Sequence, residues 1–135
     1  PETYIAETEV RYQFYHTIAS ATTEAQLEDA QTALIDRFGK LPKETENLIA
    51  INTIKLKANK LGIHSIVSRP GGILIDVGEQ PLIDPKKLLE LVSSSDLYGF
   101  GGKQHIKILQ APSQDQEEIL AVQFLLQRLQ NQQSE

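Results

Sequence analysis

Residues 63–77 read IHSIVSRPGGILIDV and mark the point where the chain changes from helical to strand patterns. Ile63 to Ser68 and Ile73 to Val77 are short runs rich in β-branched side chains, and Pro70-Gly71-Gly72 separates them. β-branched residues favour strands, while proline and glycine favour the turn between two strands. The segment therefore predicts a β-hairpin.

Three helices are predicted before this hairpin. In the first, apolar residues recur on one helical face at Val10, Phe14 and Ile18. Thr23, followed three residues later by Gln26, is typical of the capping box that begins a helix, and Gly39 suits the end of that helix. The third helix is expected over about 42–61, with Pro42 in its first turn and Gly62 after its end. Its broad apolar face is typical of a central helix.

After the hairpin, Asp84 followed by Pro85 predicts the start of a further helix. A second strand pair is expected at Leu97 to Phe100 and Gln104 to Leu109, followed by a C-terminal helix. The predicted fold is α+β, with three N-terminal helices, two short antiparallel hairpins with a helix between them, and a C-terminal helix. We expect residues 1–135 to form a single domain.

The composition excludes several classes of protein. The chain carries 18 acidic and 13 basic residues, a net charge of −5, which works against binding of nucleic acid through phosphates. There is no cysteine, and therefore no disulfide or thiolate site. No apolar run is long enough to span a bilayer, so we expect a cytoplasmic protein without membrane contact. The chain begins at Pro1 and has no methionine, as expected for a piece of a longer protein.

No catalytic, cofactor-binding or metal-binding residue is predicted. The three histidines stand without the partner spacing of a metal site, at His16, His64 and His105. The segment Gly99 to Gln104 (GFGGKQ) lacks the hydroxyl residue that follows lysine in a phosphate loop, and it is interpreted as a tight turn. Asp76 is expected in a strand facing solvent and Asp84 at a helix cap, which argues against a paired-carboxylate site.

Asp36 is the one residue that conflicts with local physical chemistry. It falls in the last turn of the second helix, where the helix dipole disfavours an acid by roughly 0.3–1 kcal/mol. It lies about 200° around the helix from Leu34, on the solvent side, and Asp29 lies on the same stripe two turns earlier. One interpretation is an ion pair of Asp36 with Arg37 or Lys40. The alternative is an acidic surface that contacts a basic partner.

The stretch from Leu34 to Pro42, LIDRFGKLP, resembles the C-terminal domain of the bacterial transcription-repair coupling factor family. The resemblance continues through short matching segments: Tyr12 to Tyr15, Ile18 to Ala21, Asn47 to Ile49, Ala58 to Ile63 and Gly71 to Ile73. Beyond Leu97 the likeness is in the order of elements more than in residues. The motif DRFG-x-LP is fairly specific to this family.

The resemblance implies a regulatory domain of a large ATP-dependent DNA translocase, with no enzymatic activity or cofactor of its own. In that family the domain packs on an N-terminal UvrB-like module of the same chain. There it masks the surface that binds UvrA and restrains the motor until RNA polymerase is engaged. The acid of the DRFG motif, here Asp36, belongs to the contacting helix. We include Asp29, on the same stripe, and Arg37, next to Asp36, among the expected contact residues. The family can also place an acid one turn earlier, where this sequence has Ala33.

The sequence is compatible with two interpretations of the function. The first is this autoinhibitory interaction domain, which would be monomeric and would meet UvrA and RNA polymerase only indirectly. The alternative is a freestanding adaptor or homodimerisation module that uses the apolar faces of the third or last helix.

Overall fold

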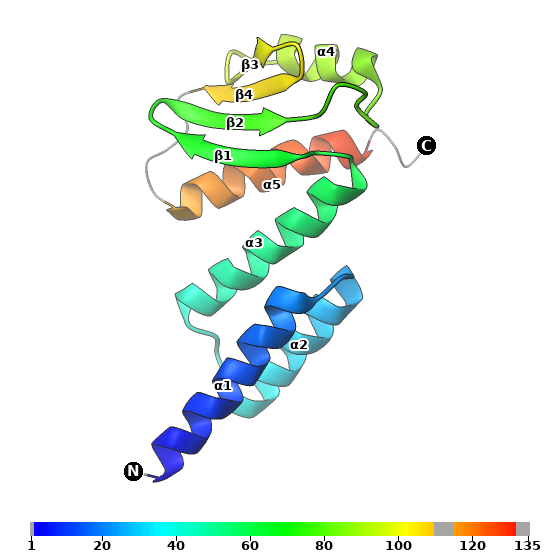
Figure 1. The fold of residues 1–135 in the computed structure, drawn as a ribbon. Coiled ribbons are helices and arrows are strands. Elements are labelled where there is room, and N and C mark those ends of the chain that lie inside the picture. The colour runs from blue at the N-terminus through cyan, green and yellow to red at the C-terminus, as the bar shows by residue number, and fades with distance from the viewer. Residues whose placement is uncertain (1, 110–114, 132–135) are drawn as a thin grey trace. The chain divides into compact units, whose positions relative to one another are not determined.

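The computed structural model describes the backbone of residues 2–109 and 115–131 and the side chains of residues 8–109 and 117–130. The elements follow the order α1 (Glu2–Ser20), α2 (Glu24–Phe38), α3 (Lys43–Lys60), β1 (Ser65–Arg69), β2 (Gly72–Asp76), α4 (Pro85–Ser93), β3 (Tyr98–Gly102), β4 (His105–Leu109) and α5 (Asp115–Asn131). This is the predicted α+β fold (Figure 1). The chain divides into two compact units, residues 1–56 and 57–135. Whether they act as the single domain expected from the sequence stays a prediction.

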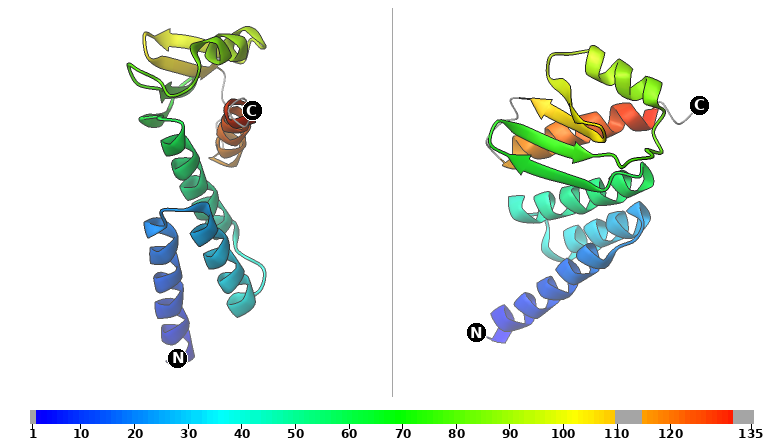
Figure 2. Two further views of the ribbon diagram at one scale, coloured as in Figure 1. Left: turned by 90° about the vertical axis from the view of Figure 1, so that its right-hand side faces the viewer. Right: turned by 45° about the horizontal axis from the view of Figure 1, so that its top comes forward.

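In the first unit, α1 and α2 run side by side in opposite directions, as both views of Figure 2 show. Their core is a cluster of buried apolar side chains: Ile18, Leu27, Ala30, Leu34, Leu41 and Ile49. The predicted stripe of α2 is thus its buried face. The Tyr15 hydroxyl lies 3.0 Å from the Thr45 Oγ1, so α1 and the first turn of α3 are also joined by a hydrogen bond. Thr45 is buried, and this bond satisfies its hydroxyl.

The ends of α2 follow the expected residues, with two differences in geometry. Thr23 is the N-cap, and its Oγ1 accepts a hydrogen bond from the Gln26 amide at 3.1 Å. The Gln26 side chain bonds back to the amide of Thr22 at 2.7 Å, one residue earlier than a capping box requires. Gly39 has the positive φ of 81° expected there, but its ψ of −148° lies outside the left-handed helical region and in one that glycine alone adopts readily.

The second unit is built on a four-stranded antiparallel sheet with the order β1-β2-β4-β3. The two predicted hairpins are present, and the pairing of β2 with β4 joins them into one sheet. β3 begins one residue later than expected and extends to Gly102, and a bulge between Phe100 and Gly102 shifts its register with β4.

One face of this sheet is apolar and covered. Alternate residues of the two central strands are buried on it: Ile73, Ile75, Ile106 and Ile108. The helix α5 runs behind the strands (Figure 1) and buries a stripe of its own: Val122, Leu125, Leu126 and Leu129. The burial of every second strand residue follows from the alternation of side chains along a strand. Near the C-terminal end of α5, Arg128 donates a hydrogen bond to the Ser94 hydroxyl at the C-cap of α4, at 3.1 Å.

Asp84 and Pro85 begin α4 as the sequence predicts. The Asp84 carboxylate accepts a hydrogen bond from the Lys86 amide at 3.0 Å, and Pro85 occupies the first turn. Asp84 therefore has the capping role that the sequence assigned to it.

Candidate functional site

The outer face of α2 is the candidate contact surface. Leu27, Ala30 and Leu34 are buried on the inner side of this helix, while Asp29, Asp36 and Arg37 are exposed. Because seven residues make nearly two full turns, Asp29 and Asp36 lie on one stripe about 10 Å apart along the axis. Arg37 is about 100° further round the helix, so it borders this stripe instead of lying on it.

Asp36 makes no ion pair with any residue in the described part of the chain, Arg37 and Lys40 included. The pairing that sequence reasoning considered for Asp36 is therefore absent from the structure. Arg37 suits its place in the last turn, because a cation stabilises the negative end of the helix dipole. Asp36 is unfavourable at the same end of the dipole, and within the described residues no cation forms an ion pair with it.

The neighbouring residues of the DRFG-x-LP motif have structural roles. The Phe38 ring meets Phe14 of α1 edge to face, with ring centroids 6.2 Å apart, and the Arg11 guanidinium lies 5.0 Å from the Phe38 ring centroid. Gly39 ends the helix, since its amide bonds the Ile35 carbonyl at 2.8 Å. Leu41 is buried in the core of the first unit. The motif thus combines residues that end α2 or pack in the first unit with two charged residues that face solvent, Asp36 and Arg37.

A second polar cluster lies at one end of the sheet in the other unit. Asp76 ends β2, and its Oδ1 accepts hydrogen bonds from the Gly78 amide at 2.9 Å and the Gln104 side chain at 2.8 Å. Its Oδ2 lies 3.8 Å from the His105 Nε2. The hydrogen bond from Gly78 holds the pKa of Asp76 below its usual range, and Gln104, His105 and His64 act in the same direction.

Sequence reasoning did not find this cluster, because it treated His105 as isolated. The two residues become neighbours only through the pairing of β2 with β4, which places Asp76 opposite His105. The cluster has a structural role, since the hydrogen bonds of Asp76 connect the end of β2 to Gly78 and to Gln104 in the β3–β4 turn. In the described residues no group of three or more His, Asp or Glu side chains is arranged to hold a metal ion.

Most of the glycine-rich segment Gly99 to Gln104 lies in β3, and only Lys103 and Gln104 form the turn that was expected for the whole segment. A phosphate loop connects a strand to the N-terminus of a helix, but here β3 leads directly into β4. None of the helices described is long and apolar enough to cross a membrane.

Comparison with known proteins agrees with these features. The family described as "TRCF domain" matches residues 1–88. The transcription-repair-coupling factor of Escherichia coli K12 is 32% identical over 130 residues, which are 96% of this chain and 11% of that protein. The protein of the same name from Bacillus subtilis 168 is 31% identical over 93 residues, 67% of this chain and 8% of its own length. The chain thus spans about a tenth of the length of these relatives.

A solved structure described as the C-terminal domain of transcription-repair coupling factor has the same fold. It superposes with a TM-score of 0.65 and covers 97% of this chain and 88% of its own, at 20% identity.

The fold and surface define a class: a small α+β domain in which Asp29 and Asp36 of α2 face solvent. More specifically, the chain belongs to the TRCF domain family, and its fold is that of the C-terminal domain of a transcription-repair coupling factor.

Proposed function

We propose that this domain is an autoinhibitory clamp that docks through the outer face of α2 on the N-terminal UvrB-like module of its own protein. In the docked state it masks the surface that binds UvrA and restrains the ATP-dependent DNA translocase. Engagement of RNA polymerase releases it. Asp29 and Asp36 form the acidic part of the contact, and Arg37 borders it.

The observation that carries this proposal is the unpaired exposure of Asp36 at the unfavourable end of its helix. An acid at this position costs stability unless a cation compensates it. Within the described residues no cation forms an ion pair with Asp36, and a basic surface on the partner would supply one. The sequence of α2 contains four acidic residues and one basic residue, so the helix as a whole favours a basic partner.

The energetics suit a reversible clamp. Exposed charge pairs contribute little each and weaken with salt, because the screening length falls to about 10 Å at 0.1 M ionic strength. A contact built on a few such pairs is specific but easily released. The domain needs no catalytic residue for this role.

The test is calorimetric titration of this domain into the isolated UvrB-like module at low and high salt. We expect binding that weakens as salt rises, and about tenfold weaker binding for Asp36→Lys. The matched control is Asp96→Lys, which makes the same change at an exposed position in the second unit and should bind like the unaltered domain. Equal affinity for Asp36→Lys and the unaltered domain would exclude the acidic contact, and absence of binding would exclude the clamp.

One observation favours the alternative of a homodimerisation module. On α5, Leu120 and Phe124 are 64% and 57% exposed and lie one helical turn apart. Burial of such a pair stabilises an interface. Light scattering over a range of protein concentrations separates the two functions, because only a dimer gives a mass that rises with concentration.

A further inference from the structure

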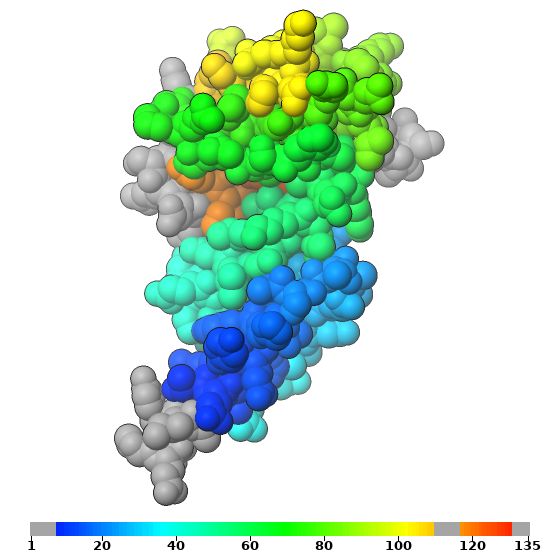
Figure 3. All heavy atoms as spheres, viewed as in Figure 1, coloured from blue at the N-terminus to red at the C-terminus, as the bar shows by residue number. Residues whose placement is uncertain are grey.

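The sheet of the second unit has a second face, which none of the helices described in that unit covers. It carries the residues that alternate with the buried isoleucines of β2 and β4. The side chains on this face include Val67, which is 41% exposed, and Leu109, which is 37% exposed. Figure 3 shows the β1–β2 hairpin in green and the β3–β4 hairpin in yellow meeting in a continuous surface on the side in view.

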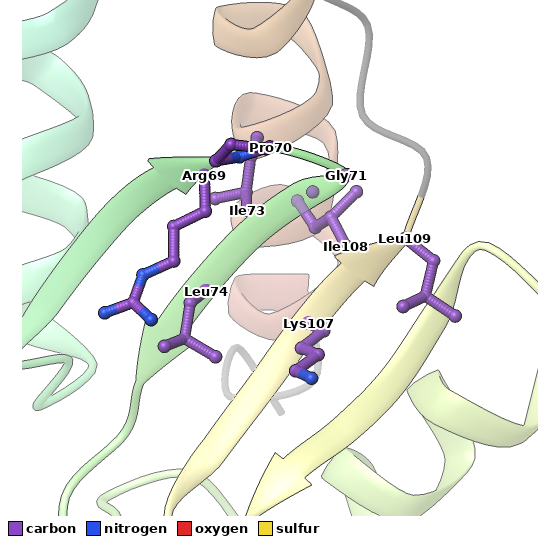
Figure 4. Close-up of a pocket in the computed structure, with 9 residues that line it drawn as sticks. Arg69, Pro70, Gly71, Ile73, Leu74, Lys107, Ile108 and Leu109 are labelled. Carbon is purple, nitrogen blue, oxygen red and sulfur yellow. The ribbon is translucent and has the colours of Figure 1, made fainter.

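A hollow of about 210 Å³ interrupts this face near the turn between β1 and β2. The strand register explains it. Gly72 lies between Arg69 on β1 and Leu109 on β4, so one row of the sheet has a gap between two side chains. The next row carries Leu74 and Lys107, which close one end of the gap. Figure 4 shows these four side chains around the hollow.

Glycines are required for this shape. A Cβ on Gly72 would lie 2.4 Å from the Ile108 carbonyl oxygen, so no side chain fits there. On β3, a Cβ on Gly101 would lie 2.8 Å from the Lys107 Cε and 3.1 Å from the Leu74 Cδ1. The side chains of Leu74 and Lys107 therefore lie across bare backbone. The glycine-rich segment that resembles a phosphate loop in sequence thus leaves room for both side chains.

The charges beside the hollow are both positive. Arg69 and Lys107 are exposed, and neither makes an ion pair or a side-chain hydrogen bond with another residue in the described ranges. The only acid on the strands of this face is Asp76, which is already bonded to Gly78 and Gln104. In a chain of net charge −5, two unpaired cations beside an apolar hollow form a distinct local surface.

The size of the hollow limits its occupant. Pockets for small molecules and cofactors are usually about 300–1,000 Å³ and more enclosed. This one has room for a single aliphatic side chain, which Leu74 and Leu109 would contact. A nucleic acid would gain little from this apolar floor, whereas a peptide can place a leucine in the hollow and carboxylates beside the two cations.

We propose that the uncovered face of the sheet is a second docking surface, for an acidic peptide segment that inserts one aliphatic side chain between Arg69, Leu74, Lys107 and Leu109. Its charge is opposite to that of the α2 surface, so it selects a different partner. It does not depend on the proposed clamp and fails or succeeds separately from it.

The test uses a fluorescein-labelled peptide with a central leucine flanked by glutamates, and the whole chain of 135 residues. We expect saturable binding in fluorescence anisotropy below about 1 mM, weakened at least about tenfold by Arg69→Glu or Lys107→Glu. Replacing the central leucine of the peptide by serine, or its glutamates by glutamines, should have a similar effect. The matched control is Lys86→Glu, an exposed lysine on α4, which should leave binding unchanged.

Amide NMR spectra keep the test valid if a variant folds poorly. Addition of the peptide to the unaltered chain should shift the signals of Gly72, Leu74 and Lys107 and leave those of Asp29 and Asp36 in place. Absence of saturable binding, equal binding by Lys107→Glu and Lys86→Glu, or shifts confined to another surface would each overturn the proposal. So would tighter binding of a short single-stranded oligonucleotide, displaced from the same residues by the peptide.

Discussion

Asp76 on β2 lies directly opposite His105 on β4, with the carboxylate Oδ2 3.8 Å from the imidazole Nε2. The other carboxylate oxygen accepts hydrogen bonds from Gly78 and Gln104. One side chain thus connects the end of the first hairpin to the turn of the second. These contacts favour the ionised form of Asp76 and lower its pKa.

Asp76→Asn should make the free energy of unfolding less dependent on pH on the acid side. The unfolded chain has an Asp pKa of about 3.9, and the folded chain a lower one. The unfolded state therefore binds more protons near and below that pH, so stability falls as the pH drops towards the lowered native pKa. Asparagine still accepts both hydrogen bonds but carries no charge. Urea unfolding followed by circular dichroism at a series of acid pH values checks this.

The control is Asp96→Asn, which removes an exposed carboxylate that accepts no hydrogen bond from a described residue. It should change the pH dependence less than Asp76→Asn does. If Asp76→Asn unfolds with the same pH dependence as the unaltered chain, the contacts of Asp76 do not favour its ionised form.

Gly72→Ala should destabilise the sheet by about 1–3 kcal/mol, because overpacking forces the backbone to move. The added Cβ would meet the Ile108 carbonyl oxygen at 2.4 Å, and this oxygen belongs to the neighbouring strand. Gly99→Ala is the matched control, since the closest atom to its Cβ is the Leu109 Cδ1 at 3.6 Å, an ordinary contact. The midpoints of urea denaturation compare the two variants. Equal midpoints would contradict the close approach of β2 and β4.

Much of the fold was predictable from local signals. Helix α2 begins at Thr23 because its hydroxyl caps the first turn, and α4 begins after Asp84 for the same reason. The first hairpin follows from Pro70-Gly71-Gly72 between two β-branched runs, and the second from the glycines before Lys103. The pairing of β2 with β4 was not predicted, because the sequence of one strand does not determine which other strand it pairs with. The order β1-β2-β4-β3 depends on burying the isoleucines of both hairpins on one face.

The candidate sites differ in the same way. The exposure of Asp36 follows from its angle on the helix, which the sequence gives directly. The Asp76 cluster and the hollow beside Gly72 depend on which residues stand opposite each other across strands. A one-residue change of register would move every one of these side chains to the other face. Sequence periodicity therefore located the helical surface and missed both features of the sheet.

Phe38→Leu should lower the stability of the first unit by about 1–2 kcal/mol. The change keeps an apolar side chain but removes the edge-to-face contact with Phe14 and the ring under the Arg11 guanidinium. Hydrogen exchange of α1 and α2 amides measures this unit specifically. If protection is the same in Phe38→Leu as in the unaltered chain, an apolar side chain at this position is sufficient and the aromatic contacts contribute little.

Ala33→Glu should strengthen docking on the UvrB-like module about two- to fivefold. Ala33 is exposed and lies between Asp29 and Asp36 on the outer face of α2, so a glutamate there extends the acidic stripe. Repulsion from Asp29 and Asp36 at helical spacing should cost the free domain a few tenths of a kcal/mol, a small loss against the core of its unit. Ala19→Glu makes the same change at an exposed position on α1 and should leave the affinity unchanged. Calorimetry of both variants at low salt decides the matter. An equal gain for both would mean that only the net charge of the domain matters, whereas weaker binding of Ala33→Glu would mean that the partner meets this face with apolar or acidic groups.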